Sequence, residues 1–174
     1  IIGSGTWGTA LAKMLTDNGL HINWCVRDEE KVKHILKRKH NPNYLTSVSF
    51  DTNLLSLFTE AEQTIKASDH IVIVTPSAYV LQQFSGVSAK ILRQKKIISA
   101  VKGMLPQHNL LLNDYLKAKF NFSIDQYFTI MGPCHAEEVA AERLSYLTFS
   151  GTQRAAAEKI ASQFSTPYIN TIVN

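Results

Sequence analysis

The glycines near the start of the chain lie between a predicted strand and a predicted helix. Gly3, Gly5 and Gly8 follow the β-branched pair Ile1 and Ile2 and precede a stretch rich in alanine and leucine. In this G-x-G-x-x-G pattern the first glycine makes a tight turn, the second lets the backbone approach a pyrophosphate, and the third lets the helix pack on the strand. Free N–H groups at the helix start would bind the anion. The pattern predicts a dinucleotide site; the alternative is a turn of small residues that serves packing alone.

Arg27 lies 19 residues after Gly8, where NAD-selective folds carry an acidic residue against the ribose hydroxyls. An arginine there suits a 2′-phosphate, through a charge-assisted bond of about 1.5–3 kcal/mol. That energy favours NADPH over NADH by about ten- to a hundredfold. Two alternatives stay open: Arg27 is an ordinary surface charge, or the neighbouring Asp28 binds the hydroxyls. NADPH is therefore the expected cofactor, with NADH as the alternative.

Two later turns combine polar residues with the end of an apolar stretch. Lys102 follows the apolar run 97–101, where its ammonium could bind an anionic substrate or polarise a carbonyl. The alternative is a lysine that only reaches from the sheet end to water. The turn at Gly132 offers free N–H groups, and Cys134 precedes His135. Sequence neighbours at a helix start do not face each other, so we do not expect a nucleophile–base pair.

Other chemically suggestive residues have simpler explanations. Trp7, inside the glycine turn, either packs over a cofactor or fills the core beneath the turn. The basic run 31–40 is a solvated helix face that would also steer anions towards the neighbouring turn. No histidine or cysteine spacing suggests a metal site, and none is expected.

The elements that must position these residues alternate along the chain. Strands are predicted over 22–26, 54–58, 71–74, 97–101, 128–131, 146–149 and 168–174. Helices are predicted over 9–18, 28–39, 60–66, 78–92, 106–119, around 136–140 and over 153–164. This alternation favours an α/β fold, a doubly wound and mostly parallel Rossmann-type sheet with helices on both faces. The glycine turn, Arg27 and the turns at 75–77, 102–103 and 132–133 all follow strands, so they should meet at the carboxyl edge of the sheet, where such folds bind ligands.

Composition limits the remaining choices. With 174 residues, 45% of them hydrophobic, the chain suits one domain over 1–174. A net charge of +4 is too small for a nucleic-acid stripe, and no apolar run is long enough for a membrane span. Two distant cysteines favour a reducing, cytoplasmic location. The first strand begins only two residues before Gly3 and the last lacks a closing element, so we expect a fragment of a longer protein.

Six motifs occur in an order that is similar to one protein family. They are the stretches 3–11, 27–28, 41–45, 75–77, 99–103 and 132–140. Together they closely resemble the N-terminal domain of bacterial NAD(P)-dependent glycerol-3-phosphate dehydrogenase, over essentially the whole chain. The resemblance implies a Rossmann-type domain from a two-domain enzyme whose C-terminal helical domain is absent from this chain.

The resemblance also implies an activity and a set of binding residues. The activity is reversible reduction of dihydroxyacetone phosphate to sn-glycerol 3-phosphate, for glycerophospholipid synthesis. The cofactor contacts that the resemblance implies are Thr6, Trp7, Arg27, Lys102 and Ala136. The glycine pattern and the turn at 75–77 add Gly3, Ser4, Gly5, Gly8 and Pro76 to the expected cofactor contacts. The implied substrate contacts are Lys102, Gly132 and Cys134. Lys102 would position both molecules, whereas the proton-transferring lysine is expected in the missing domain.

Cys134 departs from the family pattern, which usually has serine or threonine there, and a thiol donates a weaker hydrogen bond. The proton-transferring lysine and most contacts to the substrate phosphate are expected in the missing domain. The chain alone should therefore bind NADPH weakly and be inactive. Two other functions stay open: another dehydrogenase with a Rossmann and a helical domain, acting on a hydroxy acid or sugar acid, and a non-catalytic dinucleotide-sensing module. A homodimer of the full-length protein is also left open.

Overall fold

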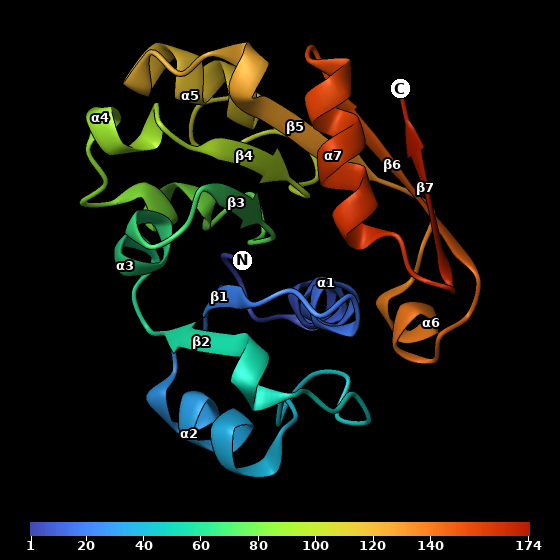
Figure 1. The fold of residues 1–174 in the computed structure, drawn as a ribbon. Coiled ribbons are helices and arrows are strands. Elements are labelled where there is room, and N and C mark those ends of the chain that lie inside the picture. The colour runs from blue at the N-terminus through green and yellow to red at the C-terminus, as the bar shows by residue number, and fades with distance from the viewer.

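The strands of the chain lie next to one another in one curved sheet, with helices on both sides of it (Figure 1). The computed structural model describes residues 1–174. The strands are β1 (Ile22–Cys25), β2 (Leu55–Phe58), β3 (His70–Ile73), β4 (Lys96–Ser99), β5 (Tyr127–Met131), β6 (Ser145–Gly151) and β7 (Ile169–Val173). Ile2 bridges Cys25 on one side and Ile73 on the other, both in parallel. It therefore joins a two-stranded and a five-stranded part in the order β2–β1–Ile2–β3–β4–β5–β6–β7.

Helices cover both faces of this sheet, as predicted. They are α1 (Thr6–Asp17), α2 (Glu29–Arg38), α3 (Ala61–Lys66), α4 (Ala89–Leu92), α5 (Leu112–Phe120), α6 (Ala136–Ala140) and α7 (Arg154–Phe164). Short 3₁₀ helices span Thr52–Leu54, Val80–Phe84 and Ile124–Gln126. Local sequence explains several ends: the Asp28 carboxylate caps the first turn of α2, and Asn121 closes α5 in the left-handed conformation.

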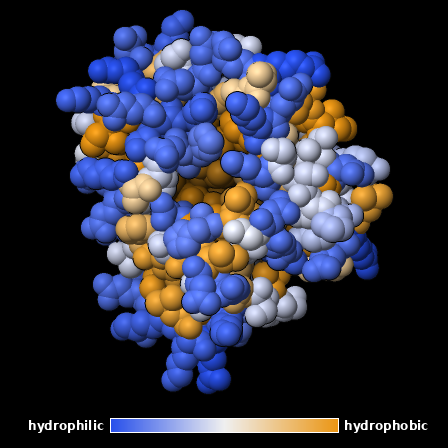
Figure 2. All heavy atoms as spheres, viewed as in Figure 1, coloured by the Kyte–Doolittle hydropathy of each residue, from blue (hydrophilic) through white to orange (hydrophobic).

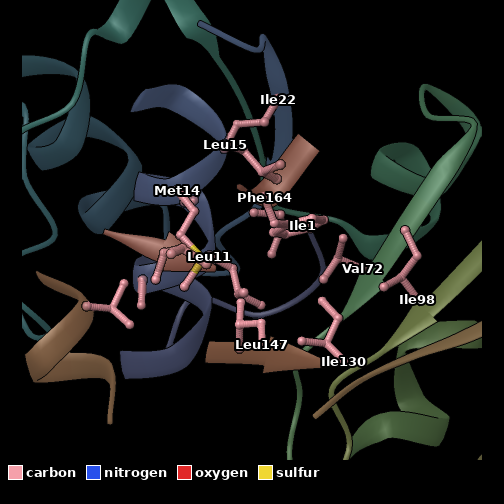
Figure 3. Packing of buried hydrophobic residues seen from close by; sticks show 14 of the residues in the cluster. Ile1, Leu11, Met14, Leu15, Ile22, Val72, Ile98, Ile130, Leu147 and Phe164 are labelled. Carbon is pink, nitrogen blue, oxygen red and sulfur yellow. The ribbon is translucent and has the colours of Figure 1, made fainter. Parts of the chain in front are cut away.

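The sheet separates two apolar cores because successive strand residues point to opposite faces. In β3, Ile71 and Ile73 belong to one core and Val72 to the other. The larger core lies under α1 and α7, where Leu11 and Phe164 approach residues of the sheet (Figure 3). This double burial explains the unbroken apolar runs in the central strands.

The sheet is mostly parallel, with one exception. β6 runs antiparallel to β5, and β7 then runs parallel to β6. The connection 132–144 contains only the short helix α6, which packs against α1. A segment of this kind returns the chain without the full crossover that a parallel partner needs.

Two predicted helices are wrong in part. The stretch 78–92 forms a turn, a 3₁₀ helix and then α4, because Gly86 has a φ of 79° and Ser88 starts a new helix by capping Ile91. The predicted helix 106–119 begins only at Leu112. Before it, Leu105 pairs with Leu110 across a turn that holds Asn109 at a φ of 53°. No helix combines the length and the apolar character that crossing a membrane requires.

Candidate functional site

The backbone register aligns four turns along the carboxyl edge of the sheet. Four residues lie side by side in neighbouring strands: Ile2, Ile73, Ser99 and Thr129. Three positions beyond each of them come Gly5, Pro76, Lys102 and Gly132. These strands are parallel, so the four turns leave the sheet at the same edge. The predicted gathering of turns at the carboxyl edge is confirmed.

The three glycines of the first turn have different surroundings. Gly3 has a φ of 123°, and a Cβ there would lie 3.1 Å from the Val74 carbonyl. A Cβ on Gly8 would lie only 2.3 Å from the Gly3 carbonyl oxygen, so α1 packs on the turn only because Gly8 has no side chain. A Cβ on Gly5 would meet nothing within 4 Å. The chain itself therefore needs glycine at 3 and 8, whereas at Gly5 the open space suits a ligand that contacts the backbone.

The carbonyl groups of this turn are all held by donors from the protein. The Trp24 indole N–H donates to the Gly3 oxygen at 2.9 Å, and the Asn41 amide donates to the Ser4 oxygen at 3.1 Å. The Gly5 oxygen accepts from both the N–H and the hydroxyl of Thr9, each at 2.9 Å. The carbonyls therefore point into the protein.

The amide groups at the start of α1 are left without partners in the chain. No backbone or side-chain acceptor receives the N–H groups of Thr6, Trp7 and Gly8, and no side chain caps the helix. Free amides and the helix dipole together make an anion site. The turn thus fits a dinucleotide pyrophosphate by its donor set as well as by its open space.

A cleft of about 490 Å³ opens over this turn. Its lining is Gly3, Ser4, Gly5, Thr6, Trp7, Cys25, Arg27, Lys31, Tyr44, Val74, Thr75, Pro76, Tyr79 and Gln83. Arg27 and Lys31 are its charged residues, and no carboxylate lines it, so the local field favours an anion. Gly8 is buried beneath the turn and does not line the cleft.

The end of the cleft at β1 and α2 is cationic and aromatic. The Lys31 ammonium lies 5.8 Å from the centre of the Tyr44 ring. Asp28 Oδ1 accepts the N–H groups of Glu30 and Lys31, so this carboxylate is used to cap α2. The neighbouring Cys25 is buried, and burial raises the pKa of its thiol, which keeps it neutral.

Trp7 combines the two roles that the sequence left open. It is partly buried, packs against the larger core and also lines the cleft. Trp24, Asn41, Lys31, Tyr44 and Tyr79 are not among the residues expected from the sequence. A strand tryptophan and an asparagine after a helix are ordinary features, and only the polar Asn-Pro-Asn turn marks the segment at 41–43.

Besides Gly8, four expected site residues lie outside the lining of this cleft. They are Lys102, Gly132, Cys134 and Ala136. Lys102 is exposed and its ammonium forms no ion pair within the chain. Ala136 is buried in the larger core. All four follow β4 or β5 at the carboxyl edge, and the turn after β4, with Lys102, is next to the cleft-lining turn after β3.

The turn after β5 is held against β6. A Cβ on Gly132 would lie 2.6 Å from the Tyr146 carbonyl oxygen, so this close approach requires glycine. The Cys134 thiol donates to the same oxygen at 2.8 Å. The thiol hydrogen is therefore directed at the protein backbone.

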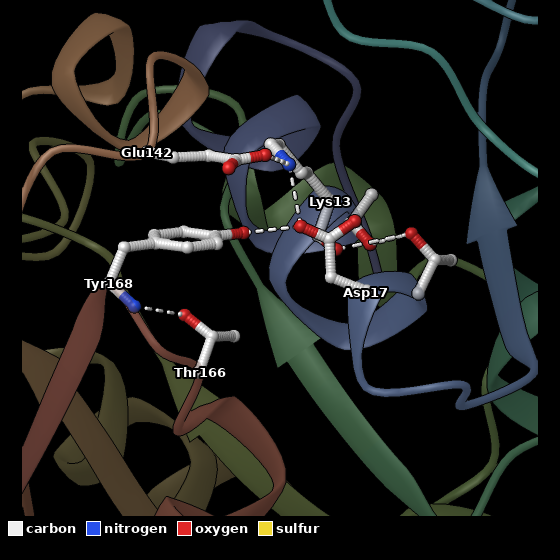
Figure 4. A network of polar contacts seen from close by, with 7 residues as sticks. Lys13, Asp17, Glu142, Thr166 and Tyr168 are labelled. Carbon is white, nitrogen blue, oxygen red and sulfur yellow. Dashed lines mark hydrogen bonds and ion pairs between the residues drawn. The ribbon is translucent and has the colours of Figure 1, made fainter.

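A polar network fastens the far half of α1 to the end of the chain (Figure 4). Lys13 forms ion pairs with Asp17 and, at 3.0 Å, with Glu142 beyond α6. The Tyr168 hydroxyl donates to Asp17. Burial lowers the pKa of Lys13, but its hydrogen bonds to Asp17 and Glu142 outweigh burial and raise it above the ordinary value. Burial and the bond to Asp17 raise the pKa of Tyr168 to about 12.

This network predicts a loss of stability in alkali. A pKa that is higher in the folded chain than in the unfolded chain adds stability below the unfolded value, and this stability disappears as pH rises through the folded value. For Tyr168 that window runs from 10.0 to about 12. We expect Tyr168→Phe to cost about 1 kcal/mol at pH 7 and to flatten the fall between pH 10 and 12, measured by urea unfolding. An unchanged alkaline slope in the variant would contradict this assignment.

A second hollow lies at the opposite, amino edge of the sheet. It has a volume of about 300 Å³, and Figure 2 shows its apolar floor near the centre of the face drawn there. Ile1, Ile22, Val72 and Phe164 contribute to its lining. Neither an arginine nor a lysine lines this hollow, and Asp69 does, so we do not assign it to the cofactor.

Comparison with known proteins decides the family. Residues 1–157 match the model for the N-terminus of NAD-dependent glycerol-3-phosphate dehydrogenase. The chain belongs to this family. Two curated relatives are the NAD(P)+ glycerol-3-phosphate dehydrogenases of Limosilactobacillus reuteri and Pediococcus pentosaceus. Over the whole of this chain they are 28% and 29% identical to it. The chain spans about half the length of these relatives, 52% in both cases.

Solved structures show the same fold. The glycerol-3-phosphate dehydrogenase of Coxiella burnetii aligns with a TM-score of 0.83 at 21% identity, over 99% of this chain and 52% of that one. The Plasmodium falciparum enzyme gives 0.85 at 22% identity, over 99% and 51%. The expected Rossmann-type fold of the glycerol-3-phosphate dehydrogenase N-terminal domain is therefore confirmed.

Proposed function

We propose that the chain is the cofactor-binding half of an NAD(P)-dependent sn-glycerol-3-phosphate dehydrogenase that reduces dihydroxyacetone phosphate for glycerophospholipid synthesis. The observation that carries the proposal is the glycine turn, whose carbonyls are held by the protein while its amides are free beside two cations. Membership of the dehydrogenase family supports it. The dinucleotide would supply the hydride.

Different residues of the cleft would bind different parts of the dinucleotide. The free amides of Thr6 and Trp7, which line the cleft, would bind the pyrophosphate. Arg27 and Lys31, with no carboxylate beside them in the lining, would bind a 2′-phosphate, which makes NADPH the preferred cofactor and NADH the weaker one. The Asp28 cap on α2 supports this choice, since that carboxylate is already used by the helix.

Lys102 and Gly132 would form this chain's part of the substrate site. Lys102 has an exposed ammonium without an ion pair, at the same level of the sheet edge as Pro76. It would polarise the ketone oxygen or hold an anionic group of the substrate. The Cys134 thiol donates to Tyr146, so it would offer the substrate only its sulfur. The group that moves the proton is assigned to the remainder of the longer protein, as is most phosphate binding.

The proposal includes a cytoplasmic location and a homodimer of the longer protein. Both cysteines are free thiols, which suits a reducing compartment. A twofold homodimer is the commonest assembly among soluble oligomers.

The activity is tested with the longer protein and with this chain in parallel. We expect the longer protein to oxidise sn-glycerol 3-phosphate with NADP⁺, about ten- to a hundredfold more efficiently than with NAD⁺, because Arg27 and Lys31 bind the 2′-phosphate. The chain 1–174 should bind NADPH and oxidise nothing. The absorbance of the reduced nicotinamide measures turnover by the longer protein and by the chain, and its fluorescence measures NADPH binding by the chain. Turnover by the chain alone, or no turnover by the longer protein, would refute the proposal.

A further inference from the structure

Asn41 is a fully buried polar side chain beside the glycine turn. Its amide nitrogen donates to the Ser4 carbonyl at 3.1 Å and to the Thr9 hydroxyl at 2.9 Å. Its amide oxygen accepts the N–H groups of Asn43 at 3.0 Å and Tyr44 at 3.3 Å. Both donors and the acceptor oxygen are thus fully used, in a site that excludes water.

These four bonds join two segments on either side of the cleft: the glycine turn with the start of α1, and the loop that contains Tyr44. Ser4 belongs to the turn whose amides face the pyrophosphate site, and Thr9 holds the next carbonyl of that turn. Tyr44 belongs to the loop on the other side, where its ring lies against Lys31 in the cleft lining. Asn41 itself does not line the cleft.

The chemistry of the site requires a neutral amide. Two donors must face two oxygens, while one oxygen must face two N–H groups, and only an amide side chain of this length supplies both sets. An aspartate would keep the acceptor but would turn a second oxygen towards the Ser4 carbonyl in a buried place. The asparagine amide therefore holds both segments in place, the glycine turn through its nitrogen and the loop through its oxygen.

We propose that Asn41 is a positioning residue that fixes the glycine turn and Tyr44 relative to each other, and so sets the affinity of the cleft for its dinucleotide. The inference rests on the proposed cofactor function. In this inference Asn41 affects the affinity for the dinucleotide without contacting it. The same bonds also contribute to stability, so the test must separate binding from folding.

The test measures the Kd of the chain for NADPH, by the fluorescence of the reduced nicotinamide, and the melting temperature of each variant. Asn41→Ala and Asn41→Asp are each expected to weaken NADPH binding about tenfold or more, because buried partners lose their bonds. Lys13→Met is the matched control, since it breaks a buried network elsewhere on α1. It should lower the melting temperature and leave the Kd unchanged.

A double-mutant cycle tests the positioning of Tyr44 directly. Tyr44→Ala should weaken NADPH binding by a smaller factor in the Asn41→Ala background than in the wild type, because the ring is already misplaced there. Fully multiplicative losses would overturn the link between the two segments. Thr9→Val, with Thr9→Ser as the rescue that keeps the hydroxyl, gives the same test of the turn if Asn41→Ala does not fold.

The outcomes separate this inference from the function on which it rests. A wild-type chain that binds NADPH, with Asn41 variants that bind it equally well, would overturn the role of Asn41 alone. That role is also overturned if Lys13→Met loses as much affinity as the Asn41 variants at an equal loss of stability. A wild-type chain that does not bind NADPH at all would overturn the proposed function and this inference together.

Discussion

An alanine at Gly5 is expected to leave the fold intact and to weaken NADPH binding about a hundredfold, or about 2.7 kcal/mol. Gly5 has a φ of −78° and a ψ of −170°, which alanine adopts without strain. Its new methyl group would meet no protein atom within 4 Å. Alanine is a poorer helix cap than glycine, but it also restricts the unfolded chain, and these two effects offset each other. The methyl group would instead occupy the space in which the pyrophosphate meets the backbone.

Gly8→Ala provides the contrast, because its methyl group would lie 2.3 Å from the Gly3 oxygen. We expect it to destabilise the chain by about 3 kcal/mol, as overpacking does. Titration with NADPH and thermal unfolding of both variants distinguish the two effects. Wild-type affinity in Gly5→Ala would show that the ligand does not lie against this turn, whatever Gly8→Ala does.

Lys102→Ala in the longer protein is expected to lower kcat about a hundred- to a thousandfold, the usual cost of removing one electrostatic group from an acyl or carbonyl site. Stability should change by less than about 0.5 kcal/mol, because the side chain is exposed and has no ion pair. The assay is NADPH-dependent reduction of dihydroxyacetone phosphate.

Lys119→Ala serves as the control for Lys102→Ala, since it removes an exposed lysine from α5. It should retain the activity of the wild type. A protein that only senses dinucleotide would show no reduction of dihydroxyacetone phosphate at all and would bind NADPH equally well in both variants. Activity of Lys102→Ala within a few-fold of the wild type would remove Lys102 from the site.

The order of the strands along the chain and the location of the ligand edge are predictable from sequence, because both depend on local patterns. The unbroken apolar run at 71–74 predicts a buried strand by itself, and the strand–glycine–helix sequence at 1–11 predicts the ligand-binding turn. Prediction failed where a single backbone angle decided the outcome. Gly86 at a φ of 79° ends a helix that the apolar spacing of 78–92 favours.

The cleft could be predicted only in part. Gly3, Gly5, Arg27 and Pro76 belong to short motifs whose position after a strand is visible in the sequence. Lys31 and Tyr44 belong to segments that the sequence singles out, the basic run 31–40 and the motif 41–45, but no local pattern shows that these two side chains line the cleft. They become cleft residues only when α2 and the loop after it fold back onto the glycine turn.

The sequence by itself determined the chemistry offered at the sheet edge: a turn of small residues, an arginine after one strand and a lysine after another. The tertiary structure alone decided the direction of the groups in that turn. Its carbonyls accept hydrogen bonds from Trp24 and Asn41, residues 21 and 37 positions away. The amides can face a ligand only because these distant donors hold the carbonyls inward, and contacts of this kind exist only once the chain has packed.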